Sequence, residues 1–265
     1  VEAMRAQAAA IGTGDLHDRL AVPGTRDELD RLAVTLNELL GRLQRAVEQE
    51  RRIVADASHE LRTPVSILLT RLDVALRQDL DHRELLHVVQ EARGDARRLA
   101  RLSEDVLMLA RADQGGLPIR PAPVEVHDLL ESAIARNSAE AGDRTIRIRQ
   151  DIPGGAVVLA DPDRTAQIMD NIITNAIRHG EGDIELEARV SSSHVRISVH
   201  DHGPGYPPEF LPHAFDRFSQ AVGVRQGGGL GLAIVAALVT AQGGTVTASN
   251  GSGCGAVTAF TLPLA

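Results

Sequence analysis

Apolar residues recur every three or four positions through most of residues 29–109, which predicts long amphipathic helices. The first predicted helix carries two successive stripes, at Leu29, Leu32, Leu36, Leu39, Leu43 and Ala46 and then at Val47, Val54, Ala57, Leu61, Val65, Leu68, Leu72 and Ala75. The next carries a stripe at Leu85, Val89, Ala92, Ala96, Leu99, Leu102, Val106 and Leu109. Polar residues 78–81 between them predict a turn. We therefore expect an antiparallel hairpin whose uncovered stripes are buried by pairing into a dimeric four-helix bundle.

The pattern changes after residue 113, where glycines and prolines break the helix and predict a hinge linker over residues 114–123. Beyond it, helical and strand periods mix. Helices are expected at 126–141, 162–179 and 230–242, and strands at 145–150, 156–160, 184–190, 194–200, 245–248 and 256–262. This order predicts an α/β sandwich with helices on one face of a mixed sheet. The whole chain is thus expected to be an α+β, multidomain protein.

The composition excludes several classes of function. The formal net charge is −8 and aromatic residues make up 2% of the chain, so the sequence offers neither a basic surface nor stacking platforms for nucleic acid. All 28 basic residues are arginines, so any phosphate clamp must be a guanidinium. Cys254 is the only cysteine, which excludes an internal disulfide. No Gly-Lys-Ser/Thr phosphate loop is present, which excludes a P-loop kinase.

His59 lies off the apolar stripe of its helix, on a polar stripe with Thr63 and Ser66. An imidazole with a reference pKa of about 6.5 is mostly unprotonated near neutral pH and can attack an electrophile. The adjacent Glu60 can accept the remaining ring proton. A histidine beside a glutamate also fits an ordinary solvated helix face, so these residues alone leave both interpretations open.

The complete run Ser58–Pro64, Ser-His-Glu-Leu-Arg-Thr-Pro, resembles the phospho-acceptor box of sensor histidine kinases. That resemblance implies that His59 is the phosphorylated residue and that Glu60 is its acid/base partner. It also implies that Thr63 positions the water that hydrolyses a phosphorylated response regulator.

A second polar face belongs to the helix predicted at 162–179, where Asn171, Asn175, Arg178 and His179 follow one another at helical spacing. Two amide oxygens one turn apart suit a Mg²⁺ ion that shares phosphate groups, and the arginine can pair with phosphate oxygens. Two asparagines by themselves would equally fit a plain polar face.

Two glycine clusters give this face a context. Asp201-x-Gly203-x-Gly205 follows a predicted strand, and Gly227-x-Gly229-Leu230-Gly231-Leu232 opens a predicted helix, where backbone N–H groups can approach phosphate.

Together with Asn171 and Asn175, these clusters resemble the N box and the two glycine boxes of the histidine-kinase ATP-binding domain, whose fold is shared with gyrase, chaperone and mismatch-repair ATPases. The resemblance implies that the two asparagines serve Mg²⁺ and that Asp201 accepts the adenine amino group. It implies a lid over ATP from Tyr206 to Gly228, with Arg217 a candidate phosphate contact.

The chain departs from the family pattern at two positions beside this site. His179 stands at the adenine-stacking aromatic position, and His202 stands where asparagine is usual.

Ahead of the hairpin, Gly14-Asp15-Leu16, Pro23-Gly24 and Asp27-Glu28-Leu29 resemble the connector and second helix of a HAMP signal-relay module. We therefore expect a partial HAMP module at 1–48, a dimerisation and phosphotransfer hairpin at 49–113, the linker at 114–123 and a catalytic ATP-binding domain at 124–265. The HAMP resemblance implies an upstream membrane segment outside this chain, and hence the cytoplasmic portion of a membrane-anchored protein.

The resemblances predict a homodimeric protein-histidine kinase that uses Mg-ATP to phosphorylate His59 and passes the phosphoryl group to an aspartate of a response regulator receiver domain. Two alternatives stay open: a dimeric scaffold that binds ATP without transferring phosphate, and an ATP-gated conformational protein. The second gives the acceptor box no role.

Overall fold

The computed structural model describes residues 19–22, 24, 28–77, 81–113, 116–149, 155–220, 229–251 and 253–265. The chain divides into two compact units, Val1–Ile67 and Leu68–Ala265. No helix within the described ranges has the length and apolar character needed to cross a membrane.

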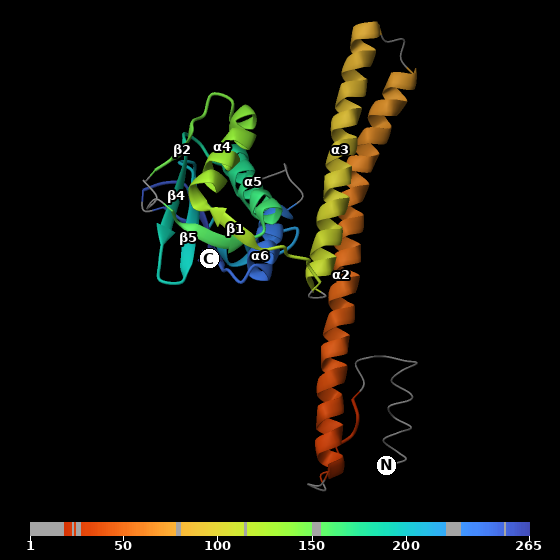
Figure 1. The fold of residues 1–265 in the computed structure, drawn as a ribbon. Helices are drawn as coiled ribbons and strands as arrows, with labels where there is room; N and C mark the ends of the chain where they lie inside the picture. The colour runs from red at the N-terminus through yellow and green to blue at the C-terminus, as the bar shows by residue number, and fades with distance from the viewer. Residues whose placement is uncertain are drawn as a thin grey trace. The chain divides into compact units, whose positions relative to one another are not determined.

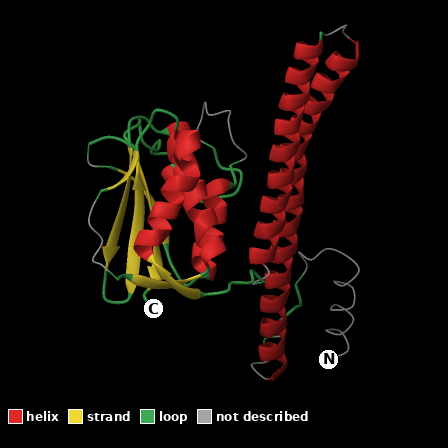
Figure 2. Ribbon diagram, turned by 45° about the horizontal axis from the view of Figure 1, so that its top comes forward, coloured by secondary structure: helices red, strands yellow, loops and turns green. Residues whose placement is uncertain are grey.

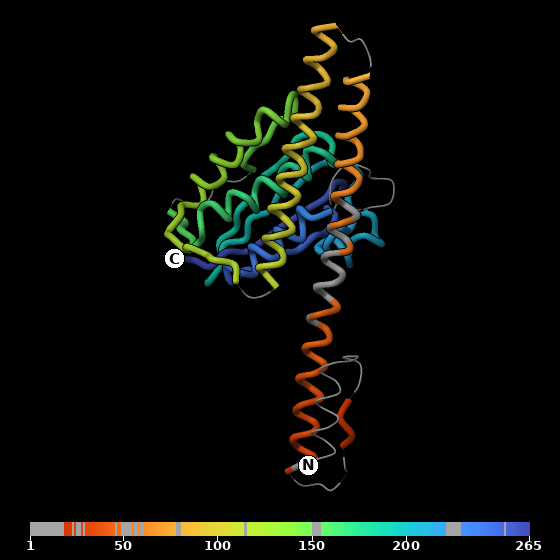
Figure 3. Tube along the Cα trace, turned by 90° about the vertical axis from the view of Figure 1, so that its right-hand side faces the viewer, coloured from red at the N-terminus to blue at the C-terminus, as the bar shows by residue number. Residues whose placement is uncertain are grey.

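The first unit is organised by helix α2 (Glu28–Arg77), which continues into the second unit and contains Pro64. The described residues before α2 run back along its first turns (Figure 3). Leu20 fixes this arrangement, because its N–H donates to Asn37 Oδ1 at 2.8 Å and its carbonyl accepts from Asn37 Nδ2 at 2.9 Å. Leu20 and Ala33 are buried there. The predicted relay helix and the first hairpin helix therefore form one continuous helix.

The end of α2 and helix α3 (His82–Asp113) form the predicted antiparallel hairpin (Figure 1). Its turn ends in a capping box: Asp81 Oδ1 accepts from the N–H of Glu84 at 2.8 Å, and Glu84 Oε2 accepts from the N–H of Asp81 at 2.9 Å. Arg71 of α2 pairs with Glu91 and Asp95 of α3. In the single chain the apolar stripe of this hairpin is open to solvent at Leu72, Leu85 and Val89.

Beyond the hairpin, the main part of the second unit is a five-stranded mixed sheet with helices on one face (Figure 2). The sheet order is β2 (Ile146–Ile148), β4 (Ile184–Val190), β5 (His194–His200), β7 (Ala256–Pro263) and β6 (Val246–Asn250). The covering helices are α4 (Val126–Ala141), α5 (Pro162–His179) and α6 (Gly231–Ala241). Alternate residues of β4, beginning with Ile184 and Leu186, are buried beneath these helices, and Glu185 lies on the opposite side. This arrangement confirms the predicted sandwich.

One part of the linker prediction is wrong. Residues 122 and 123 belong to strand β1 (Ala122–Glu125), which pairs antiparallel with β3 (Val157–Ala160) in a separate two-stranded sheet. The prolines suggested a break because proline cannot donate a ladder hydrogen bond. Among the described strands, β1 pairs only with β3, so the other edge of β1 makes no ladder hydrogen bonds. A proline, which has no N–H to donate, is tolerated in such an edge strand.

Candidate functional site

The predicted phospho-acceptor lies in the first unit. His59 and Glu60 are residues of helix α2, and their side chains lie outside the described part of the structure. Thr63, about one turn further along α2, has an exposed side chain. The predicted exposure of the His59 imidazole stays a prediction.

In the second unit, α5 presents the two predicted magnesium ligands as half-buried side chains, Asn171 and Asn175. The amide nitrogen of Asn175 donates to the hydroxyl of Tyr206 at 3.3 Å, and that hydroxyl lies 2.7 Å from Thr258 Oγ1. Burial raises the pKa of Tyr206, so its hydroxyl stays protonated. Because the nitrogen of Asn175 is held by Tyr206, its carbonyl oxygen is the atom left for the predicted cation.

Asp201 follows the last residue of β5 and is 5% exposed. Its Oδ1 accepts hydrogen bonds from the N–H of Gly203 at 2.9 Å and from the N–H of Ala256 at 3.2 Å. The backbone around it is close: a Cβ on Gly203 would lie 2.8 Å from the Cα of Gly180. The carboxylate is therefore fixed by two backbone N–H groups, and the close approach of Gly203 to Gly180 leaves no room for a Cβ on Gly203.

The other glycines of the two clusters also have structural reasons. Gly205 has φ +79°, and a Cβ there would lie 2.7 Å from Asn250 Oδ1. Gly229 has φ +62°, and a Cβ there would lie 2.6 Å from the carbonyl carbon of Phe218. Both positions combine a left-handed backbone with a close approach, which favours glycine. Gly227 lies outside the described residues.

Helix α6 brings the second glycine cluster to the asparagines. The nearest atom to a Cβ placed on Gly231 would be Asn171 Oδ1, at 3.8 Å. Leu230, at the N-cap position, makes no side-chain capping hydrogen bond, so the first N–H groups of α6 have no side-chain cap. Leu232 is buried and packs with Tyr206 in a small apolar cluster. The structure thus joins the N box and both glycine clusters around one helix N-terminus.

The two residues at the end of α5 differ in their surroundings. The guanidinium of Arg178 pairs with the carboxylate of Glu140 on α4 at 3.1 Å, at the surface. In this structure Arg178 therefore contacts a carboxylate, whereas the sequence predicted a contact with phosphate. Loss of hydration lowers the pKa of His179, the guanidinium of Arg178 lowers it further, and Asp201 opposes both. The His179 imidazole is therefore mainly neutral at pH 7, which suits an adenine-stacking ring.

Arg217 was predicted to contact phosphate from the lid, and the structure places it elsewhere. Its guanidinium pairs with Asp113, the last residue of α3, and donates to the carbonyl oxygen of Leu109 at 3.3 Å. A helix C-terminus carries partial negative charge and free carbonyl groups, so it attracts a cation. Arg217 thus ties the segment between the glycine clusters to α3.

Arg144 was missed by the sequence analysis. Its guanidinium donates to the carbonyl oxygens of Ala176 (3.1 Å), Ile177 (2.8 Å), Gly180 (3.1 Å) and Gly182. It therefore satisfies the last carbonyl groups of α5 and holds the loop beside Asp201. No local pattern signals this role, because the partners lie more than thirty residues away in sequence.

The residues also fit the ligands that the resemblance implies. Amide oxygens and a helix N-terminus are suitable partners for Mg²⁺ and for phosphate oxygens. A side chain at Gly231 would enter the space next to Asn171 Oδ1, so the absence of one keeps that space open.

Comparison with protein-family models finds three matches along the chain. Residues 160–265 match the histidine kinase-, DNA gyrase B-, and HSP90-like ATPase family, residues 49–115 the His Kinase A (phospho-acceptor) domain, and residues 1–45 the HAMP domain.

Curated relatives agree with these matches. The chain is 40% identical over 202 residues to a probable sensor histidine kinase HK of Mycobacterium tuberculosis, covering 76% of this chain and 52% of the relative. It is 30% identical over 260 residues to the signal transduction histidine-protein kinase BaeS of Escherichia coli, covering 96% of this chain and 55% of the relative. The chain thus spans about half the length of the curated relatives it matches.

Among solved structures, the Acinetobacter baumannii histidine kinase AdeS shares the fold with a TM-score of 0.66 at 24% identity, over 78% of this chain and 98% of that one. Full-length ShkA in complex with AMPPNP has a TM-score of 0.59 at 29% identity, over 81% of this chain and 46% of that one. With the three domain matches in their order along the sequence, these findings show that the chain belongs to the sensor histidine kinases of two-component systems.

Proposed function

We propose that this chain binds ATP in its C-terminal domain, phosphorylates His59, and passes the phosphoryl group to an aspartate of a response regulator receiver domain. The observation that carries the proposal is the approach of Asn171 Oδ1 to the start of α6, together with the backbone-held Asp201, within a domain that matches an ATPase family. The acceptor box supplies the nucleophile, within a region that matches the phospho-acceptor family.

In the proposed reaction, a ring nitrogen of His59 forms a bond to the γ-phosphorus of ATP. The bond from that phosphorus to the β,γ-bridging oxygen breaks, and ADP leaves with the electron pair. Glu60 takes the remaining imidazole proton, so the ring stays neutral while it attacks. The pocket then contributes mostly position and charge neutralisation.

The pocket residues have separate roles in this proposal. Asp201, held by two backbone N–H groups, accepts the adenine amino group, and the neutral ring of His179 lies beside it. Asn171 and Asn175 hold Mg²⁺, which when bound neutralises charge on the phosphate groups. The first N–H groups of α6 face phosphate oxygens.

We further propose a homodimer through the hairpin, because Leu72, Leu85 and Val89 of its two apolar stripes are 40%, 43% and 51% exposed in the single chain. Thr63 serves dephosphorylation of the regulator. The HAMP match supports an origin in a membrane-anchored sensor.

The experiment is incubation of the chain with Mg²⁺ and ATP labelled at the γ-phosphate. We expect a label on His59 that is labile in acid and stable in alkali. His59→Gln should lose the label, and His87→Gln, at an exposed histidine of α3, should keep it. Asn171→Ala should also stop labelling. A chain that binds ATP but gains no label would instead be the scaffold, and persistent label in His59→Gln would contradict the assignment.

A further inference from the structure

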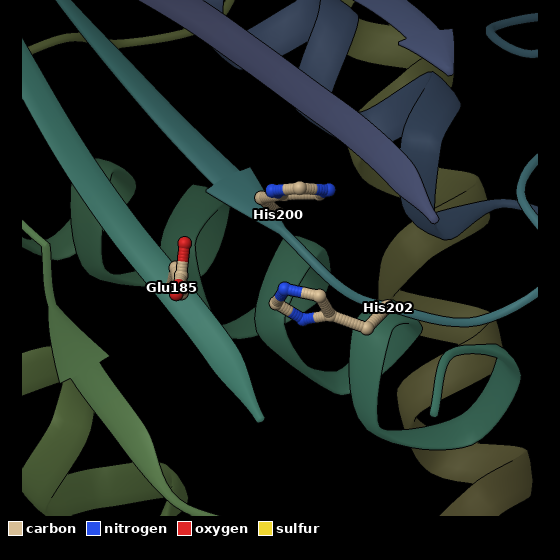
Figure 4. A group of neighbouring side chains, drawn as sticks. All are labelled: Glu185, His200 and His202. Carbon is tan, nitrogen blue, oxygen red and sulfur yellow. The ribbon is translucent and has the colours of Figure 1, made fainter. Parts of the chain in front are cut away.

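Three metal-ligating side chains gather on the face of the sheet that the helices leave open. Glu185 of β4 and His200 of β5 stand directly opposite each other in the strand pairing, and His202 follows two residues later. One ligand atom of each residue lies within 4.8 Å of the other two. Figure 4 shows the two imidazoles one above the other with the Glu185 carboxylate beside them on the neighbouring strand.

Hydrogen bonds to backbone carbonyls fix which nitrogen of each ring is protonated. His200 Nε2 lies 3.1 Å from the carbonyl oxygen of Cys254, and His202 Nδ1 lies 2.9 Å from the carbonyl oxygen of Asp183. A carbonyl oxygen only accepts, so each of these nitrogens is an N–H donor. In a neutral imidazole the other nitrogen then carries a lone pair. His200 Nδ1 and His202 Nε2 are therefore the nitrogens that can act as ligands, and a backbone carbonyl bound to the opposite nitrogen is typical of metal-bound histidines.

The Glu185 carboxylate is also held by neighbouring groups, in this case by ion pairs. Glu185 is 14% exposed and pairs with Arg147 at 3.3 Å and with Arg149 at 3.5 Å. Both guanidinium groups are more than half exposed, so these ion pairs are weak. They orient the carboxylate and leave it able to give an oxygen to a metal ion.

We infer that Glu185, His200 and His202 form a binding site for a transition-metal dication of the Zn²⁺ type. Two imidazoles and one carboxylate are a common ligand set for zinc, with water at the fourth position. Ligand atoms about 2.1 Å from a tetrahedral zinc lie roughly 3.4 Å apart, so the three side chains must draw closer and the two stacked rings must turn for their lone pairs to meet at one ion. The imidazoles distinguish it from the oxygen-only Mg²⁺ site proposed at Asn171 and Asn175.

The site lies next to Asp201, the residue proposed to accept the adenine amino group. His200 and His202 flank Asp201 in sequence, so one bound ion would hold the chain on both sides of that carboxylate. This consequence for ATP rests on the proposed function, whereas metal binding itself does not.

The test is a calorimetric titration of the chelator-treated full chain with Zn²⁺ alone, without nucleotide or Mg²⁺. We expect one saturable site whose affinity falls at least about tenfold in His202→Asn and in Glu185→Gln, the loss typical when a metal site is disturbed. Asparagine is the residue that the family usually carries at position 202, so this variant should fold. His127→Asn, at an exposed histidine of α4, and Cys254→Ser should bind Zn²⁺ as the unaltered chain does.

Thermal unfolding provides a second measurement on the same proteins. At one fixed Zn²⁺ concentration, the unfolding midpoint should rise in the unaltered chain and in both controls, and should rise less in the two ligand variants. The assignment would be overturned by a chain with no saturable site, or by equal affinity in the unaltered chain and both ligand variants.

Discussion

The carboxylate of Asp201 lies so close to the backbone of Gly180 that a Cβ added to this glycine would be 2.4 Å from Asp201 Cγ. We predict that Gly180→Ala displaces the carboxylate and weakens ATP binding at least about tenfold, with a loss of about 1–3 kcal/mol in the free energy of unfolding from overpacking. Titration with a fluorescent nucleotide and denaturant unfolding measure the two effects.

Gly253→Ala is the matched control, because nothing lies within 4 Å of a Cβ at that position. It should leave both quantities unchanged. If Gly180→Ala bound ATP as tightly as the unaltered chain, Asp201 would not be the group that fixes the adenine end.

Arg144 supports the same loop from the other side. We predict that Arg144→Met destabilises the domain by about 1–3 kcal/mol, because several carbonyl groups at the end of α5 lose their charged donor. Nucleotide affinity should fall as well, since the loop beside Asp201 is released. Arg189→Met is the control: that side chain is 69% exposed and pairs with the neighbouring Glu187. If Arg189→Met lowered the free energy of unfolding by the same amount, the effect of Arg144→Met would come from the loss of a surface charge.

The half-buried Asp105 of α3 should make stability depend on pH. Burial, with the nearby charge of Glu104, raises its pKa to about 6, against the opposing effect of Arg101. A raised folded-state pKa means that Asp105 contributes stability below its unfolded pKa of about 3.9, and that this contribution is lost as the pH rises through about 6.

Asp105→Asn should therefore stabilise the chain at pH 7 by on the order of 1 kcal/mol, after allowance for solvent screening, and should change little below pH 4. Denaturant unfolding at several pH values measures this. Asp143→Asn, at an exposed position, should show no such pH-dependent gain. A gain for Asp105→Asn that is equally large at pH 4 would mean that packing and not ionisation is responsible.

The exposed Thr63 allows two activities to be separated. Thr63→Ala should keep labelling of His59 by ATP and should slow dephosphorylation of the phosphorylated regulator severalfold, because the hydroxyl is proposed to orient water and not to accept phosphate. Loss of the two activities in parallel would show that Thr63 supports the helix instead. Ser66→Ala, one turn further on, serves as the comparison.

Local signals explain which elements could be predicted from the sequence. The predicted helices at 126–141 and 162–179 agree with α4 and α5, and the second begins where an aspartate precedes a proline. Asp161 does cap α5 by accepting from the N–H of Arg164. The β4 and β5 ranges also agree, because alternation is clear in half-buried strands.

Long-range relationships could not be predicted in this way. Nothing near Glu185 in sequence indicates that it faces His200, because strand register is set by the packing of the whole sheet. The same holds for Tyr206, whose hydroxyl meets Asn175. The nucleotide residues were found from motifs, and the residues that position them, such as Arg144, depend on contacts that only the folded chain reveals.

The ion pair between Arg217 and Asp113 has a consequence for coupling between the nucleotide site and helix α3. One guanidinium cannot give the same hydrogen bonds to a carboxylate and to a phosphate group, so the phosphate contact predicted for Arg217 would compete with its ion pair to Asp113. Nucleotide that draws this arginine away would release the end of α3, and a hairpin that holds it would keep it from the nucleotide. Nucleotide binding and the conformation at the end of α3 would then be coupled through this one side chain.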